Sequence, residues 1–143
     1  MEISEDMTDK TVSIFISYAS EDRKKVDVIY QRLENKGYAP WMDKHSLIAG
    51  KNWKRSIEKA IKDCDFFLLC LSKNTDKDGF IQHEIRDALD MWKQKRPDSS
   101  YILPIRLEAC EAPYEIEDIQ WIDYFEKDWW NKLMQAINIE INK

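Results

Sequence analysis

The segment Thr11–Asp22, TVSIFISYASED, constrains the fold more than any other part of the chain. Its first half alternates along the strand period and fills the core positions with β-branched or aromatic residues, which predicts a well-covered β-strand. Ser20 and the two acidic residues after it are typical of a helix N-cap and first turn. A strand followed so closely by a helix opens an α/β domain, in which ligands collect at the carboxyl ends of the strands. We therefore expect Tyr18, Ala19 and Ser20 to border any binding site.

Predicted strands and helices alternate along the rest of the chain. Parallel neighbouring strands need crossover helices, so this alternation predicts a parallel sheet. The expected fold is a flavodoxin-like three-layer α/β domain, a five-stranded parallel sheet of order 2-1-3-4-5 flanked by helices. After the first strand, the expected elements are helix 21–36, strand 38–42, a short helix from residue 53, strand 65–72, helix 80–95, strand 101–107, strand 120–125 and helix 128–139.

Two prolines and one apolar run predict where individual strands lie in the sheet. Pro40 cannot donate to a ladder, so the second strand is expected at an edge. Pro104 indicates an edge or irregular position and imperfect pairing for the fourth strand. The run Phe66–Leu71 is continuously apolar, as in a central strand that helices cover on both faces.

Length and charge limit the domain organisation and the partners. The chain has 143 residues, which suits one domain over residues 11–143, and residues 1–10 are expected to be a disordered lead-in or linker. A formal charge of −5 offers no general attraction to nucleic acid. The longest apolar run is too short to cross a membrane, and the acidic, polar start is unlike a signal peptide.

The cysteines indicate a cytoplasmic protein. Cys64, Cys70 and Cys110 form no C-x-x-C pair and are odd in number, and two of them lie in or beside an apolar strand. We interpret them as buried, reduced thiols, which are typical of the cytosol.

The third predicted helix places an aromatic residue beside a carboxylate. Phe80 and Glu84 are one turn apart on a shoulder of the apolar stripe, near the carboxyl edge of the sheet. Such a pair suits a flat heterocycle joined to a sugar, because the ring can stack while the acid stabilises an oxocarbenium cation. The alternative is structural, with Phe80 plugging the core and Glu84 as a solvated acid on the helix face.

Several other chemistries do not fit the residues. A response-regulator receiver needs acidic residues where this chain has Ser17, Tyr18 and Ser72. The scattered glycines match no phosphate-binding loop. His45 and His83, with the dispersed cysteines, form neither a zinc site nor a Cys-His dyad, so no metal and no cofactor is expected.

The loop 43–52 carries apolar residues, Leu47, Ile48 and Ala49, between turn-forming ones. Apolar groups on a loop either fold back onto the core or meet a partner, and the residues alone leave both alternatives open.

Taken together, these segments resemble a Toll/interleukin-1 receptor (TIR) domain of the short, bacterial, NAD+-cleaving type. The run Val12–Asp22 is similar to the first box of that family, and Trp41–Trp53, WMDKHSLIAGKNW, to its second strand and BB loop. FFLLCLS matches its third strand, and FIQHEIRDAL at Phe80–Leu89 resembles the helix with its catalytic glutamate.

The resemblance implies an enzyme that cleaves the nicotinamide-ribose bond, with NAD+ as substrate rather than cofactor. Glu84 matches the catalytic glutamate of the W-x-x-x-E motif, and Phe80 replaces its tryptophan. Asp43 and the loop Tyr18–Ser20 match residues that line the substrate cleft. Relatives with arginines in that loop suggest that Arg23, Lys44 or Lys51 supplies positive charge to the diphosphate here.

The resemblance also implies assembly. In many such enzymes the BB loop packs against a neighbouring TIR domain, and Leu47, Ile48, Ala49 and Gly50 fit that role. We expect a homo-oligomer or filament that a fused or separate sensor domain clusters, in antiphage defence. The alternative is a non-enzymatic TIR signalling or scaffold domain, and a flavodoxin-like cofactor binder is a third.

Overall fold

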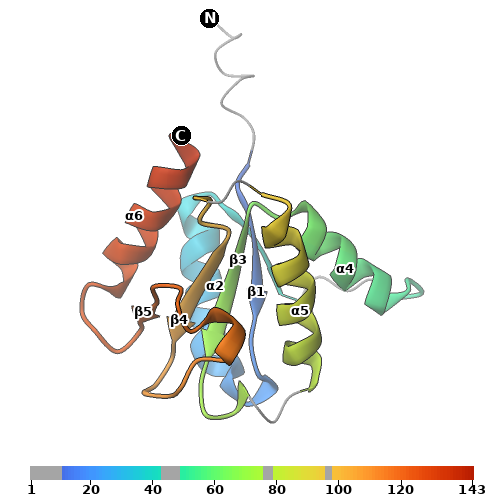
Figure 1. Ribbon diagram of the computed structural model, residues 1–143, viewed down its shortest axis with the longest axis horizontal. Helices are drawn as coiled ribbons and strands as arrows, with labels where there is room; N and C mark the ends of the chain where they lie inside the picture. The colour runs from blue at the N-terminus through green and yellow to red at the C-terminus, as the bar shows by residue number, and fades with distance from the viewer. Residues whose placement is uncertain (1–10, 43–48, 76–78, 96–97) are drawn as a thin grey trace, which may run out of the picture.

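The computed structural model describes residues 11–42, 49–75, 79–95 and 98–143, without the side chains of residues 79 and 80. Five parallel strands form one sheet in the order β2-β1-β3-β4-β5, which confirms the predicted flavodoxin-like fold (Figure 1). The strands are β1 (Ser13–Ser17), β2 (Ala39–Met42), β3 (Phe66–Leu71), β4 (Ile102–Arg106) and β5 (Ile122–Asp123). The α-helices are α2 (Arg23–Lys36), α4 (Trp53–Asp63), α5 (Gly79–Lys93) and α6 (Trp129–Ile141), and η1 (Ser20–Asp22) and η3 (Tyr114–Ile116) are 3-10 turns.

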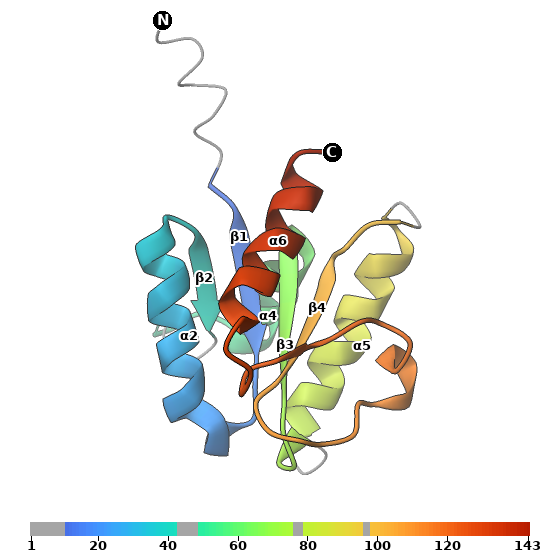
Figure 2. The same ribbon diagram turned by 90° about the vertical axis from the view of Figure 1, so that its left-hand side faces the viewer.

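The two faces of the sheet bury separate apolar clusters. Successive side chains of β1 point to opposite faces, so Ile14 and Ile16 pack with α2 and α6, whereas Phe15 packs with α4 and α5. Figures 1 and 2 show the two helix pairs on either side of the sheet. Phe15 stacks on Phe67 of β3 with ring centroids 5.4 Å apart, which joins the two central strands on the α4/α5 face.

Both prolines lie where a missing amide is tolerated. β2 is an edge strand, as predicted, and Ala39 donates to Val12 O at 2.8 Å, so the alternate residue Pro40 faces the open edge. Leu107, directly after β4, donates to Leu71 O of β3 at 2.8 Å, and Arg106 O accepts from Tyr124 after β5 at 2.9 Å, so the even-numbered residues of β4 face β5. Pro104 therefore faces the side on which pairing with β5 begins only at Ile105, and the pairing of β4 is imperfect there, as predicted. β5 is shorter than the expected strand.

Of the two capping predictions for α2, the one for its carboxyl end is confirmed and the one for its amino end is not. Gly37 ends the helix in the left-handed conformation with φ 102°, as predicted, because a residue without Cβ adopts it at little cost. The prediction of Ser20 as N-cap was wrong. Ser20 begins η1, no side chain caps this end, and α2 starts at Arg23. The acidic residue Asp22 instead bonds to a distant strand end, as described below.

The cysteines are free thiols, with Cys64 and Cys70 buried and Cys110 partly buried. Burial raises the pKa of the Cys70 thiol, and the charge of Asp22 raises it further. Among the described residues, none of the helices has the length and apolar character that crossing a membrane requires.

Candidate active site

Glu84 lies at the carboxyl edge of the sheet with its side chain turned inward. The residue is 5% exposed, and Ser17 Oγ donates a hydrogen bond of 2.5 Å to Glu84 Oε1. Ser17 is the last residue of β1 and is 1% exposed. A buried carboxylate is thus held at the end of the first strand, where open α/β sheets bind ligands.

Helical spacing explains why Glu84 points inward. The apolar residues Ile81, Ile85 and Ala88 of α5 are buried against the sheet. Glu84 is three residues after the first of these and four before the last, so it shares their side of the helix. The same spacing leaves His83 exposed, as the sequence indicated.

Ser17 is a site residue that the sequence analysis did not select. Its position follows from the strand period, because Ser17 shares the sheet face of Phe15 and Phe15 packs on the α4/α5 side. A polar residue at the end of an apolar strand, on the face that α5 covers, was the signal available. It became useful only once α5 was placed over that face.

The three residues after β1 point in different directions, toward one face of the sheet, toward the other face, and into solvent. Ala19 is buried in the α4/α5 cluster, on the side of Glu84. The Tyr18 side chain lies in the opposite cluster, near Ile16 and Val26. Ser20 is exposed. The backbone of the predicted loop therefore borders the edge of the sheet, but the Tyr18 side chain points away from Glu84.

Several predicted site residues lie outside the described residues. These are Asp43, Leu47, Ile48 and the side chain of Phe80. Of the predicted BB loop, Ala49 and Gly50 are described, and both are exposed in a turn. Gly50 has φ 87°, a left-handed conformation that favours glycine.

A small hollow of about 40 Å³ opens beside Glu84, between the first two turns of α4 and the second and third turns of α5. Asp87 of α5 and Glu58 of α4 are among the residues that line it. Burial, and secondarily the negative charge of Glu58, raises the pKa of the Asp87 carboxyl. Trp53 was predicted only as the start of a helix, yet it lines this hollow and is 46% exposed. The other lining residues include Ile57 and Glu58 of α4 and His83, Glu84 and Asp87 of α5.

A second carboxylate, that of Asp22, fastens two strand ends at this edge. Asp22 accepts from Ser72 Oγ at 2.5 Å and from Asn74 Nδ2 at 3.0 Å, and it is 9% exposed. The backbone N–H of Ser72 in turn donates to Thr75 Oγ1 at 2.9 Å. The turn after β1 and the turn after β3 are therefore tied together next to the candidate site.

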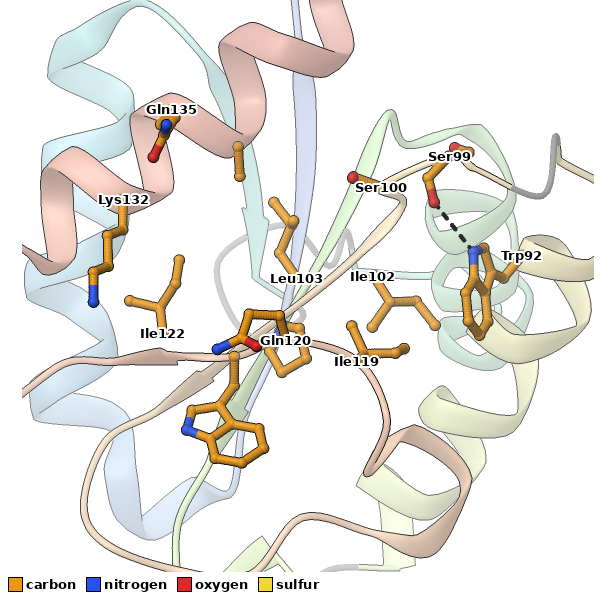
Figure 3. Close-up of a pocket in the computed structure, with 13 residues that line it drawn as sticks. Trp92, Ser99, Ser100, Ile102, Leu103, Ile119, Gln120, Ile122, Lys132 and Gln135 are labelled. Atoms are coloured by element: carbon orange, nitrogen blue, oxygen red, sulfur yellow. Dashed lines mark hydrogen bonds between the residues drawn. The ribbon is translucent and has the colours of Figure 1, made fainter.

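A larger cavity lies beside β4, away from Glu84. Figure 3 shows this cavity of about 430 Å³ between β4, the chain before β5, and α6. Lys132 and Gln135 extend from α6, and Trp92 Nε1 donates to Ser99 O at 3.3 Å. None of the residues that line it carries a carboxylate, and none belongs to the predicted site. Its size alone gives no reason to place acid chemistry there.

The chain is an open parallel α/β domain of the flavodoxin type, and it holds a buried carboxylate at the carboxyl edge of its sheet. The chain belongs to the TIR domain family, because the sequence profile of that family matches residues 14–137. In structure it is similar to the TIR domain of the Toll-related receptor TRR-2 from Hydra magnipapillata. The TM-score is 0.74 at 22% identity, over 87% of this chain and 97% of that one.

Two curated relatives carry enzyme names. The chain is 29% identical over 112 residues to an NAD(+) hydrolase, TcpA, from a Theionarchaea archaeon, which covers 67% of this chain and 34% of that protein. It is 27% identical over 116 residues to a probable 2′ cyclic ADP-D-ribose synthase, TcpO, from Methanobrevibacter olleyae, which covers 80% of this chain and 31% of that protein. The chain thus spans about a third of the length of either relative.

Proposed function

We propose that this TIR domain cleaves the nicotinamide-ribose bond of NAD+, with Glu84 as its catalytic carboxylate. The observation that carries the proposal is the position of Glu84, buried at the carboxyl edge and hydrogen-bonded to Ser17. The names of the two relatives, an NAD(+) hydrolase and a cyclic ADP-ribose synthase, support the same substrate.

The proposed reaction uses the negative charge of Glu84. The bond between ribose C1′ and the pyridinium nitrogen breaks, its electron pair passes to the ring nitrogen, and neutral nicotinamide leaves. The carboxylate stabilises the oxocarbenium ion that remains on the ribose. A water molecule attacks C1′ and gives a proton to the carboxylate, which yields ADP-ribose. Attack by a hydroxyl of the same molecule instead of water yields a cyclic isomer.

Replacing the carboxylate by an amide tests the proposal. Glu84→Gln keeps the size of the side chain but removes its charge, so nicotinamide release should fall by roughly two to four orders of magnitude. The matched control is Glu34→Gln, an exposed glutamate on α2, which should release nicotinamide at the wild-type rate. Both are measured by chromatography on protein clustered on beads.

The same experiment separates the enzyme from the alternative scaffold. A pure scaffold releases no nicotinamide at any protein concentration, whether or not it is clustered. Release that is equal in the wild type and Glu84→Gln would remove Glu84 from the mechanism.

We propose further that self-assembly through the loop Leu47–Gly50 activates the domain, as the family resemblance implies. Ala49 and Gly50 are exposed in a turn and accessible to a neighbour. In this proposal a fused or separate sensor clusters cytoplasmic TIR domains during antiphage defence. The chain's relatives are about three times as long as the part it matches, which leaves room in those proteins for such a sensor.

A charge placed in the loop tests the assembly. Ile48→Glu should abolish the rise of specific activity with protein concentration, because a carboxylate is costly to bury at a contact. The control is Val28→Glu, which replaces an apolar residue that is 53% exposed on α2 and should keep that rise. A concentration dependence that survives Ile48→Glu would show that another surface makes the contact.

A further inference from the structure

The side chain of Asp22 bonds to the turn after β3, whereas its backbone belongs to the turn after β1. Its Oδ2 accepts from Ser72 Oγ at 2.5 Å, and its Oδ1 accepts from Asn74 Nδ2 at 3.0 Å. The Asp22 N–H donates to Ala19 O at 2.8 Å. One residue therefore fixes the two turns relative to each other, at the carboxyl edge of the sheet where α5 also begins (Figure 2).

The turn that Asp22 holds is closed by its own hydrogen bonds. The Ser72 N–H donates to Thr75 Oγ1 at 2.9 Å, and the Thr75 N–H donates to Ser72 O at 3.1 Å. The Asn74 N–H donates to Ser72 Oγ at 3.0 Å. The exposed fractions are 9% for Asp22, 4% for Ser72 and 3% for Thr75. Because little water reaches these groups, the carboxylate fastens the turn more strongly than it would at the surface.

The position of this turn affects the position of Glu84. Only three residues separate Thr75 from Gly79, where α5 begins, and Glu84 follows five residues later. A chain so short passes on a displacement of the turn to the helix. On the other side of the contact, Ser17 lies directly before the turn after β1. A shift between the two turns therefore changes the distance between Ser17 Oγ and Glu84 Oε1, which is 2.5 Å in this structure.

We propose that Asp22 is a positioning residue of the candidate active site, which holds the turn after β3 so that α5 presents Glu84 to Ser17. The inference deepens the proposed function, on which its kinetic test rests. A misplacement of about 1 Å at a reacting group can cost roughly 100-fold in rate, even when its cause lies away from the chemistry. Asp22 therefore affects the reaction through the turn and not by contact with the substrate.

A second carboxylate on the same turn provides a matched control. Glu108, which follows β4, accepts from the Lys73 N–H at 2.8 Å, and this hydrogen bond is exposed. Water competes for both groups, so the bond adds little to the fixing of the turn. Glu108→Gln should therefore behave like the wild type in both tests below.

The first test measures amide hydrogen exchange without substrate. Asp22→Asn keeps the shape of the side chain but turns an NH2 group toward that of Asn74, so that two donors face each other. Amides 81–88 of α5 should then exchange about tenfold faster, while those of α6 keep their wild-type rates. The double substitution Asp22→Asn/Asn74→Asp reverses donor and acceptor and should restore slow exchange.

The second test measures nicotinamide release by clustered protein, per folded molecule. The kcat of Asp22→Asn should fall about tenfold, because Glu84 is displaced but not removed. The double substitution should recover most of kcat. Asn74→Ala keeps the Asp22 carboxylate and removes one of its two donors, so it should shift exchange and kcat in the same direction by less. It decides the question if Asp22→Asn does not fold, which circular dichroism shows.

The outcomes separate this inference from the proposed function. Wild-type exchange at amides 81–88 in the folded variants of Asp22 and Asn74 would overturn the role of Asp22. Faster exchange with an unchanged kcat would also overturn it, because Asp22 would then only stabilise the fold. If the clustered wild type releases no nicotinamide, the proposed function fails, whereas faster exchange that the double substitution reverses still assigns the placement of α5 to Asp22.

Discussion

The two ends of β1 carry the same pair of groups in different settings. At the amino end, Asp65 Oδ2 accepts from the backbone N–H of Ser13 at 2.9 Å and from its hydroxyl at 3.3 Å, and the Asp65 N–H donates to Ser13 Oγ at 3.1 Å. At the carboxyl end, Ser17 Oγ donates to Glu84 at 2.5 Å. Ser13 and Ser17 lie on the same face of the same strand, so the two pairs differ in their surroundings and not in the strand that carries them.

The two pairs differ in what their hydrogen bonds join. The Ser13 and Asp65 contacts involve the backbone of both residues and fasten the start of β1 to the start of β3. The bond from Ser17 joins two side chains and reaches across from a strand to a helix, where the carboxylate also lines a hollow.

Removal of the Ser17 hydroxyl should change activity more than it changes stability. Ser17→Ala removes the donor that orients Glu84, so kcat of clustered protein should fall about 10-fold to 100-fold while KM for NAD+ changes little. The acid limb of the pH profile of kcat should move to higher pH, because a carboxylate that loses a donor holds its proton more tightly. Nicotinamide release measured across pH 4 to 8 gives both values.

Ser13→Ala is the matched control for that prediction, since it removes a hydroxyl from the same strand and the same face. Its kcat and pH profile should equal those of the wild type. Restoration of wild-type kcat by Ser17→Cys, which keeps a small polar side chain, would support positioning. An unchanged pH profile in Ser17→Ala would show that the Ser17 hydroxyl does not affect the Glu84 carboxylate.

The next effect is on stability, at the amino end. Asp65→Ala leaves the Ser13 N–H without its carboxylate partner, which should lower the free energy of unfolding by about 1 to 2 kcal/mol. The expected loss lies at the lower end of the range for charged hydrogen bonds because Ser13 and Asp65 are only partly buried. Urea denaturation measures the loss, and kcat per folded molecule should not change. A stable Asp65→Ala protein with reduced kcat would contradict the assignment of this end to structure.

The sequence predicted the fold because each strand carries its own local signal. The apolar run of β3 indicated a central strand, and the prolines in β2 and β4 indicated where pairing is absent or imperfect. Helical spacing placed Glu84 near the apolar stripe of α5, so its position at the sheet was also predictable. The end of α2 at Gly37 followed from the requirement for positive φ.

The partners of the candidate site were not predictable in the same way. Ser17 and Trp53 come from different elements than Glu84, and only the packing of α4 and α5 on one face brings them together. Ser20 is not the N-cap because the chain first forms the 3-10 turn η1 and α2 begins only at Arg23. Asp22, the residue before α2, accepts from Ser72 across 50 residues of chain, a tertiary bond that local propensity does not contain. Contacts between distant elements are set by the assembled sheet rather than by neighbouring residues.

Asp87→Asn should change stability only slightly, and in the direction opposite to Asp65→Ala. Burial and the charge of Glu58 raise the pKa of the Asp87 carboxyl in the folded state above its unfolded value. The resulting penalty is absent at low pH, where the group is protonated in both states, and appears as pH rises through the raised pKa. Asp87→Asn should therefore raise Tm by about 1 °C at pH 7 and leave it unchanged at pH 3, with the exposed Asp90→Asn as the smaller control. Removing a carboxylate should then stabilise the domain at Asp87 and destabilise it at Asp65, because burial disfavours the first charge whereas the second accepts hydrogen bonds from Ser13. A loss of Tm in Asp87→Asn at pH 7 would contradict an unfavourable charge at this position.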